Sequence, residues 1–169
     1  TFFIIFNLLG VLPLINGLLL LPQQRGKLPA WPFVLSSLGL GFFGIGAYLS
    51  VRPSPPTKES MGELTGIQKI AENKILSYSL VALAAFSVVT VVLQGDVDVR
   101  GYKDLLASSR FVFVSSLDLV ILSASAAALI PADYKLRSID DSGDSPPPWW
   151  GYVPVVGPAV YCAWRPSLL

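Results

Sequence analysis

Long apolar stretches separated by short polar ones dominate the pattern of hydrophobic and polar positions along the chain. Four of these stretches reach the roughly 20 residues that a helix needs to cross a hydrocarbon core of about 30 Å. They are residues 2–21, 30–51, 75–93 and 111–130. Strands of a membrane barrel would instead alternate apolar and polar residues over about 10 positions. The pattern therefore predicts four membrane-spanning helices.

A fifth apolar stretch is too short for the same conclusion. Residues 149–164 carry no charge, but they include Pro154, Gly157 and Pro158. Lipid tolerates a broken backbone only where protein satisfies its polar groups, so this segment is a kinked span, a re-entrant hairpin or a stretch buried against other helices. We expect an embedded helix here. The chain, residues 1–169, is thus predicted to be one all-α, polytopic transmembrane domain with four or five membrane-embedded helices.

The polar connections predict two smaller features. Leu64, Ile67 and Ile70 recur at helical spacing. They predict an amphipathic helix over residues 58–74 that continues directly into the third membrane-spanning helix. Residues 138–148 are acidic and proline-rich, which is typical of a solvated linker.

Small residues are concentrated in the second predicted membrane helix. On one continuous helix they form two faces, the first with Ser37, Gly41 and Gly44 and the second with Gly39, Gly46 and Ser50. Small residues let helix backbones approach closely in lipid. The two faces therefore predict contact with helices on both sides, or with a flat ligand.

The composition supports a membrane protein and excludes several functions. Hydrophobic residues make up 53% of the chain and charged residues only 14%, whereas a soluble domain has about 25% charged residues. The formal net charge of +1 provides no basic excess for binding nucleic acid. The chain has no histidine, which excludes zinc sites built on histidine and haem ligation through it. Its single cysteine, Cys162, excludes an internal disulfide.

The basic residues do not predict an orientation in the membrane. With five crossings, the 12 lysines and arginines divide evenly between the two sides. With four crossings, Arg165 changes sides and the division becomes seven against five. Neither division is uneven enough for the positive-inside rule to decide the orientation.

Asp118 is the most unusual candidate for a functional residue, because it lies within the fourth predicted membrane helix. A carboxylate in lipid is costly and normally faces protein, water or a partner group. Asp118 is interpreted either as a structural hydrogen-bonding group, or as a contact for a partner, cation or pigment magnesium, or as a proton relay. The structural interpretation is favoured because no second acid or base lies within the predicted spans.

Asn7 and Asn16 are the other two polar candidates, both on the first predicted membrane helix. Nine positions separate them, so at 100° per residue they lie on opposite faces and do not form one site. Each is interpreted as a ligand or pigment contact, or as an interhelical hydrogen bond. Hydrogen bonding between helices is the favoured interpretation. No pattern for a metal site or a catalytic triad is present.

Five short strings in the sequence occur in a familiar order: LPAWPF (28–33), SRF (109–111), SLD (116–118), GPAVY (157–161) and RP (165–166). Together they resemble an uncharacterised family of integral membrane proteins from cyanobacteria and plastids. The resemblance implies a chloroplast thylakoid membrane, a transit peptide removed before Thr1, and a role in photosynthesis. It implies no catalytic residues.

These observations predict a protein that is not an enzyme. We expect an accessory or scaffold subunit of a larger thylakoid membrane complex, in the first place a photosystem–antenna supercomplex. Its expected partners are other membrane subunits, lipids, and chlorophyll and carotenoid at its periphery, with Asn7, Asn16 and Asp118 as candidate pigment contacts. The alternative is a transient assembly factor or a small membrane transporter.

Overall fold

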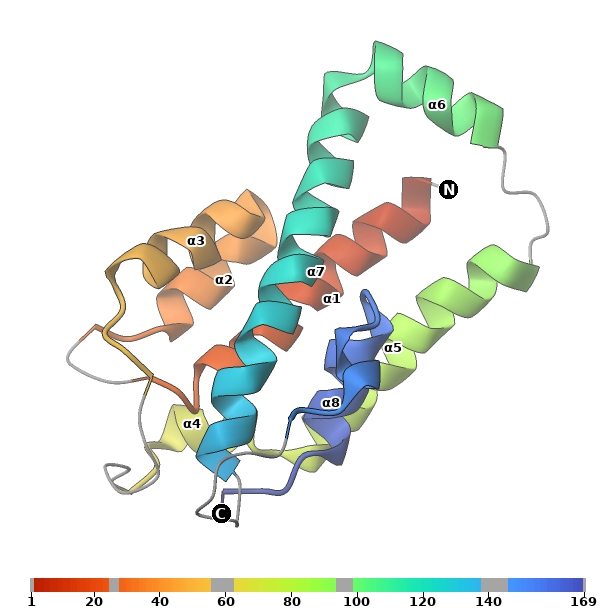
Figure 1. Cartoon of the computed structure of the whole chain (residues 1–169). Helices are drawn as coiled ribbons and strands as arrows, with labels where there is room; N and C mark the ends of the chain where they lie inside the picture. The colour runs from red at the N-terminus through yellow and green to blue at the C-terminus, as the bar shows by residue number, and fades with distance from the viewer. Residues whose placement is uncertain (1, 25–27, 56–62, 94–98, 138–145, 169) are drawn as a thin grey trace.

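The computed structural model describes residues 2–24, 28–55, 63–93, 99–137 and 146–168. Within these ranges the chain forms eight α-helices, one 3₁₀ helix and no strand, which confirms the all-α class. The elements are α1 (Phe2–Leu20), α2 (Trp31–Leu40), α3 (Phe42–Val51), α4 (Gly66–Ala71), α5 (Lys74–Leu93), α6 (Val99–Ser108), α7 (Arg110–Arg137), η2 (Trp149–Tyr152) and α8 (Val156–Trp164). Figure 1 shows their arrangement.

Three long helices, α1, α5 and α7, form the frame of the molecule (Figure 1). Two buried amides, Asn16 on α1 and Gln23 just beyond its end, fix the direction of α1 relative to α7. Asn16 donates to the carbonyl oxygen of Leu122 at 3.0 Å, and Gln23 donates to that of Leu129 at 3.3 Å. Because both pairs advance by seven residues, or about two helical turns, α1 and α7 run parallel. α5 packs against α1 and runs in the opposite direction.

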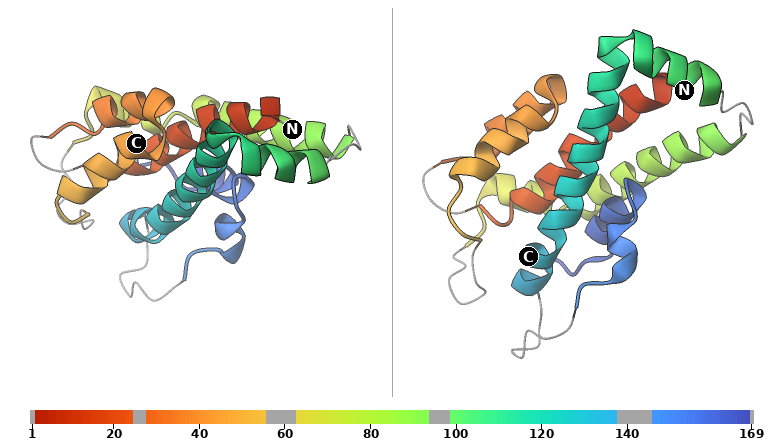
Figure 2. Two further views of the ribbon diagram at one scale, coloured as in Figure 1. Left: turned by 90° about the horizontal axis from the view of Figure 1, so that it is seen from above. Right: turned by 45° about the horizontal axis from the view of Figure 1, so that its top comes forward.

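The prediction of one continuous helix over residues 30–51 is wrong. The chain breaks at Gly41, whose φ of 61° lies in the left-handed region that glycine adopts without steric cost. α2 and α3 then fold back on each other as an antiparallel hairpin, visible in both views of Figure 2. The rings of Phe33 and Tyr48 lie with centroids 5.6 Å apart across it. Each helix has 10 residues, so each is about 15 Å long.

The small residues of this segment consequently do not form two continuous faces. Ser37 and Gly44 are both buried, and they face each other across the hairpin. A Cβ at Gly44 would lie only 2.7 Å from the backbone nitrogen of Ser37. Gly39, by contrast, has no atom within 4 Å of the position that its Cβ would take. Gly44 therefore serves the close approach of α2 to α3 rather than contact with a second protein.

The fifth apolar segment also folds back on itself. The chain passes through η2, turns, and returns through α8 toward the end of the molecule where α4 lies (Figures 1 and 2). Val155 forms the turn and has a positive φ of 67°. Gly157 follows because a Cβ there would lie 2.5 Å from the carbonyl oxygen of Trp150. Of the three predicted alternatives, the structure does not fit a kinked span. The segment is folded back as a hairpin, and most residues of α8 are buried against the other helices.

The structure also differs from the expected pattern at two helix boundaries. The helix that contains the fourth predicted membrane span continues beyond residue 130 as α7 to Arg137, through Pro131 and across two further turns. Ion pairs made by Asp133 and Arg137 hold these turns against α8 and the α4–α5 junction. The predicted amphipathic helix does not run directly into the third membrane helix, because Glu72 and Asn73 separate α4 from α5. Residues 138–145, most of the predicted linker, lie outside the described residues.

One described helix, α7, is long and apolar enough to cross a membrane by length and composition. The described apolar parts of α1, α2, α3 and α5 are each shorter, between 10 and 17 residues. The prediction of a polytopic protein with four or five membrane-embedded helices is therefore not supported, chiefly because the second segment is a hairpin and the fifth contains an α-helix of only nine residues.

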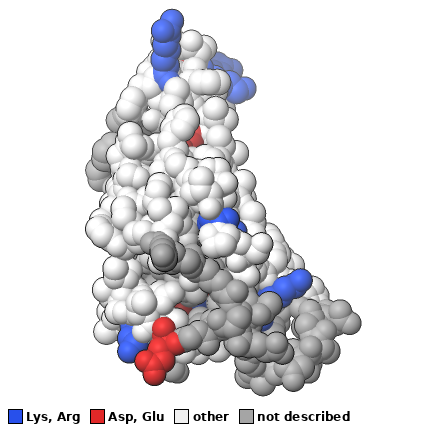
Figure 3. All heavy atoms as spheres, turned by 90° about the vertical axis from the view of Figure 1, so that its left-hand side faces the viewer, with Lys and Arg blue, Asp and Glu red and all other residues white. Residues whose placement is uncertain are grey.

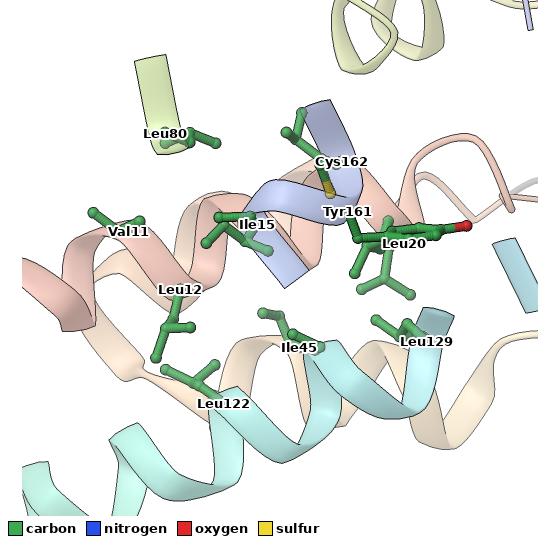
Figure 4. Packing of buried hydrophobic residues seen from close by; sticks show 14 of the residues in the cluster. Val11, Leu12, Ile15, Leu20, Ile45, Leu80, Leu122, Leu129, Tyr161 and Cys162 are labelled. Carbon is green, nitrogen blue, oxygen red and sulfur yellow. The ribbon is translucent and has the colours of Figure 1, made fainter. Parts of the chain in front are cut away.

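The core is apolar between the helices and lies along α1. Leu12 of α1 points toward Leu122 of α7, and Ile15 of α1 lies beside α8, which carries Tyr161 and Cys162 (Figure 4). Leu80 of α5 and Ile45 of α3 complete the same cluster. α1 is thus the central helix, and the other long helices and both hairpins pack around it.

We predict that Gly44→Ala destabilises the hairpin whereas Gly39→Ala does not. The new Cβ at position 44 must push apart two backbones that are in contact, which typically costs about 1–3 kcal/mol. The Cβ at position 39 meets open space. Thermal unfolding of both variants in mild detergent measures the difference. Equal midpoints for the two variants would show that the hairpin does not depend on this close approach.

Candidate functional site

Four charged side chains form a buried cluster at one end of the helix bundle. Glu72 comes from the α4–α5 junction, Asp133 and Arg137 from the last turns of α7, and Arg165 from the residue after α8. Each side chain is at most 2% exposed. We refer to these four residues as the charge cluster.

Arg137 is bonded to both acids of the charge cluster. Its Nε lies 2.7 Å from Oδ2 of Asp133, one helical turn earlier, and its Nη2 lies 3.1 Å from Oδ1 of the same residue. Toward Glu72, its Nη2 donates to Oε1 at 2.6 Å and its Nη1 to Oε2 at 2.8 Å. The planar guanidinium is suited to such paired hydrogen bonds with carboxylates. Arg137 therefore joins α7 to the α4–α5 junction.

Arg165 extends the charge cluster to α1. Its Nη1 donates to Oδ1 of Asp133 at 2.8 Å. Its Nη2 donates to the carbonyl oxygens of Leu18 and Ala71 at 2.9 and 3.2 Å, and lies 3.4 Å from Oε1 of Glu72. The carbonyls near a helix C-terminus lack intrahelical partners, and Arg165 supplies one at the ends of both α1 and α4.

Lys74 and the charge cluster together fix residues 165–168. Lys74 donates to the carbonyl oxygens of Ala163 and Arg165, the first at 2.9 Å. Arg137 donates to the carbonyl oxygen of Pro166 at 2.6 Å, and Oε2 of Glu72 accepts the backbone N–H of Leu168 at 3.0 Å. The charged groups therefore hold this segment against α5 and α7 through its backbone.

The chemistry of the charge cluster is that of a closed structural network. Its two carboxylates and two guanidiniums balance in charge, and all four carboxylate oxygens accept hydrogen bonds, including one from the hydroxyl of Tyr161 at 3.0 Å. Burial acts to raise the pKa of Glu72, but the hydrogen bond from Arg137 and the charge of Arg165 outweigh it and hold the pKa below its ordinary value. Glu72 is thus held as a carboxylate, with no oxygen free for proton transfer.

Sequence reasoning missed the charge cluster, although one signal was present. Asp133 and Arg137 lie four residues apart, the spacing that brings an acid and a base together on one helical face. Both residues lie beyond residue 130, where the apolar stretch ends, so the hydrophobic pattern does not place them on a helix. Nothing in the sequence pairs them with Glu72 or Arg165, which lie far away along the chain.

The structure gives Asp118 a definite partner. Its Oδ1 accepts the backbone N–H of Phe42, the first residue of α3, at 2.7 Å. The carboxylate also lies against Gly41, where no Cβ would fit. The N–H groups of the first helical turn have no intrahelical partner, so Asp118 caps α3 from a neighbouring helix. This contact fits the interpretation of Asp118 as a structural hydrogen-bonding group.

A second polar residue of α7 does the same for the other hairpin. Ser123 Oγ accepts the backbone N–H of Val155 at 3.1 Å, directly before α8 begins. Gly41 and Val155 are the only positive-φ residues among those that the structure describes. Both irregular turns are therefore held by polar side chains of α7, five residues apart.

Asn16 is completely buried and hydrogen-bonded. Its amide nitrogen donates to the carbonyl oxygens of Leu12 and Leu122 at 2.9 and 3.0 Å, and its oxygen accepts the hydroxyl of Ser125 at 2.7 Å. These contacts fit an interhelical hydrogen bond and leave no exposed surface for a pigment magnesium. Gln23, which was not predicted, repeats the contact two turns later, although its Oε1 has no partner among the described groups.

Asn7 is partly exposed near the start of α1. It lies nine residues from Asn16, about 13 Å along the helix, whereas Asp118 lies at the tip of the α2–α3 hairpin. The three predicted residues are therefore not assembled into one site. Within the described part of the chain, no group of three acids, cysteines or histidines could hold a metal ion.

None of the family models, curated proteins or solved structures compared with the chain matches it. The resemblance to the cyanobacterial and plastid membrane family stays a prediction. Statements about function therefore rest on the sequence and the geometry alone.

We predict that Asp118→Asn is tolerated and that Asp118→Leu is not. Asparagine retains an oxygen that accepts the N–H of Phe42, whereas leucine leaves this group unpaired, which costs about 1–3 kcal/mol when it is buried. Limited proteolysis near the α2–α3 hairpin and the thermal midpoint in mild detergent report the loss. If the asparagine variant is as unstable as the leucine variant, the negative charge itself is needed and a purely structural role is wrong.

Proposed function

We propose that the protein is a non-catalytic accessory subunit that is embedded in a membrane and packs against other membrane proteins and lipid. The observation that carries this proposal is an inverted distribution of side chains. Asn16, Asp133, Arg137 and Arg165 are buried, while many large apolar side chains are exposed. A water-soluble fold has the opposite arrangement.

The exposed apolar side chains are large and lie on several helices. Phe43 of α3 and Leu93 of α5 are each 78% exposed, and Phe111 and Val120 of α7 are 57% and 61% exposed. On the side of the molecule where α2 and α3 lie, most of the surface is uncharged, and charged groups show at the two ends and at isolated points between them (Figure 3). Soluble monomers rarely expose apolar patches larger than a few hundred Å². Lipid tails or apolar helices of other subunits suit this surface.

The non-catalytic part of the proposal rests on how the polar groups are used. The acids of the charge cluster are held by arginines, Asp118 caps α3, and Asn16 bridges two helices. The chain has no histidine to act as a general base near neutral pH. These side chains thus support a scaffold rather than a reaction.

The photosynthetic setting remains part of this proposal on the strength of the sequence resemblance alone. In that setting, chlorophyll or carotenoid would contact the apolar outer faces of the helices rather than Asn16. The alternative, a transient assembly factor or small transporter, is less well supported. Transport needs a solvated polar path, whereas the charge cluster is buried and Arg165 is hydrogen-bonded to the backbone carbonyls of Leu18 and Ala71.

Fractionation of native membranes tests the proposal in two steps. We expect the protein to stay with the membrane after alkaline carbonate washing, and to comigrate in constant ratio with a larger complex after solubilisation in mild detergent. Release by carbonate would contradict membrane embedding. An embedded protein that migrates alone, or in a small and variable ratio, would favour the assembly-factor or transporter alternative. Pigment absorption in the same fractions tests the photosynthetic setting separately.

A further inference from the structure

We propose that the chain crosses the membrane three times, through α1, α5 and α7, and that both hairpins re-enter from the same, basic side. The interaction surface is the belt of exposed apolar side chains, and its occupant is the lipid bilayer. By the positive-inside rule, the basic side faces the compartment from which the protein is inserted into the membrane, which we call the side of insertion. This inference rests on the proposed membrane embedding and adds the number and direction of the crossings.

The parallel packing of α1 and α7 excludes a crossing by residues 30–51. Two full crossings between α1 and α7 would make these helices antiparallel. The bonds from Asn16 to Leu122 and from Gln23 to Leu129 show that they are parallel, so an odd number of crossings lies between them. α5 supplies that crossing, and the α2–α3 hairpin returns to the side from which it started.

The lengths of the helices are compatible with this arrangement. The whole of α1 and of α5, which extend beyond their described apolar parts, comprise 19 and 20 residues, so at 1.5 Å per residue they are about 28–30 Å long, close to the thickness of a hydrocarbon core. α3 and α8, with 10 and nine residues, reach only about half of that depth. The two hairpin turns consequently lie inside the membrane, where lipid offers no hydrogen bonds.

An irregular backbone within a membrane must be satisfied by protein. Asp118 and Ser123 of α7 meet this requirement, because they accept the N–H groups of Phe42 and Val155 at the two turns. The charge cluster lies at the other end of both hairpins, where Arg165 follows α8. Each hairpin is thus held at its turn within the membrane by α7, and the second is also held at its base.

The basic residues divide unevenly in this topology. Among described residues, six lie at the hairpin-base end: Arg52, Lys69, Lys74, Lys135, Arg137 and Arg165. Three lie at the opposite end, on α6 and at the start of α7: Arg100, Lys103 and Arg110. Arg25, Lys27 and Lys58 are counted with the first group from the sequence alone, because the proposed topology has no crossing between α1 and α5.

The division is therefore nine against three, or seven against three when the two neutralised arginines of the charge cluster are left out. The even division calculated for five crossings does not apply to this topology. A bias of this size predicts that the hairpin bases and residues 165–168 face the compartment of insertion, with the start of α1 on the other side.

Labelling of single cysteines in sealed vesicles of known orientation tests the topology. The full chain with Cys162→Ala serves as the background, since this buried thiol is the only native one. Leu28→Cys precedes the α2–α3 hairpin and Ser54→Cys follows it, both at exposed positions. Lys103→Cys on α6 reports the opposite side. A membrane-impermeant maleimide is added from each side in turn, and carbonate washing checks embedding in the same preparation.

We expect positions 28 and 54 to react from the side of insertion only, and position 103 from the other side only. Reaction of positions 28 and 54 from opposite sides would overturn the re-entrant hairpin while leaving the protein embedded. Reaction of both from the side opposite to insertion would overturn the orientation. Release of the protein by carbonate would instead contradict the proposed function, so the failures are distinguishable.

Discussion

The charge cluster of Glu72, Asp133, Arg137 and Arg165 is the interaction on which the rest of the structure depends. It joins the ends of α1, α4, α7 and α8 and the start of α5 at one point. A buried charge that loses its partner costs several kcal/mol, so the four groups stabilise the fold only as a complete set. The helix ends are held together because the loss of any one member leaves another buried charge without its partner.

α7 makes the polar contacts that fix the other elements at several points along its length. Its last turns carry two members of the charge cluster, and its middle supplies Asp118 and Ser123 to the two hairpin turns. Its carbonyl oxygens at Leu122 and Leu129 accept the amides of Asn16 on α1 and of Gln23 just beyond it. The polar side chains of an apolar protein are thus used to satisfy one another and the backbone. The exterior is left apolar, and this distribution of side chains is the observation behind the proposed scaffold role.

The sequence predicts the helices better than their connections. Length and apolarity locate α1, α5 and most of α7, because any uncharged stretch of this kind favours a helix. The same signal cannot distinguish a crossing from a hairpin, since Gly41 is compatible with both and the deciding contact comes from Asp118, 77 residues later. Asp118 and Asn16 were recognised as unusual for their location. The charge cluster was missed because its members lie at the edges of apolar stretches, where charges are expected to be solvated.

The acid stability of a Glu72→Gln variant tests the central role of the charge cluster most directly, with exposed Glu63→Gln as the control. Since the pKa of Glu72 is held below its ordinary value of about 4.3, the wild-type midpoint of thermal unfolding in mild detergent should be constant from pH 7 to about 5 and fall below about 4.5. At pH 7, Glu72→Gln should lower it by on the order of 10 °C, and Glu63→Gln by little. Equal midpoints for both variants and the wild type would contradict the account.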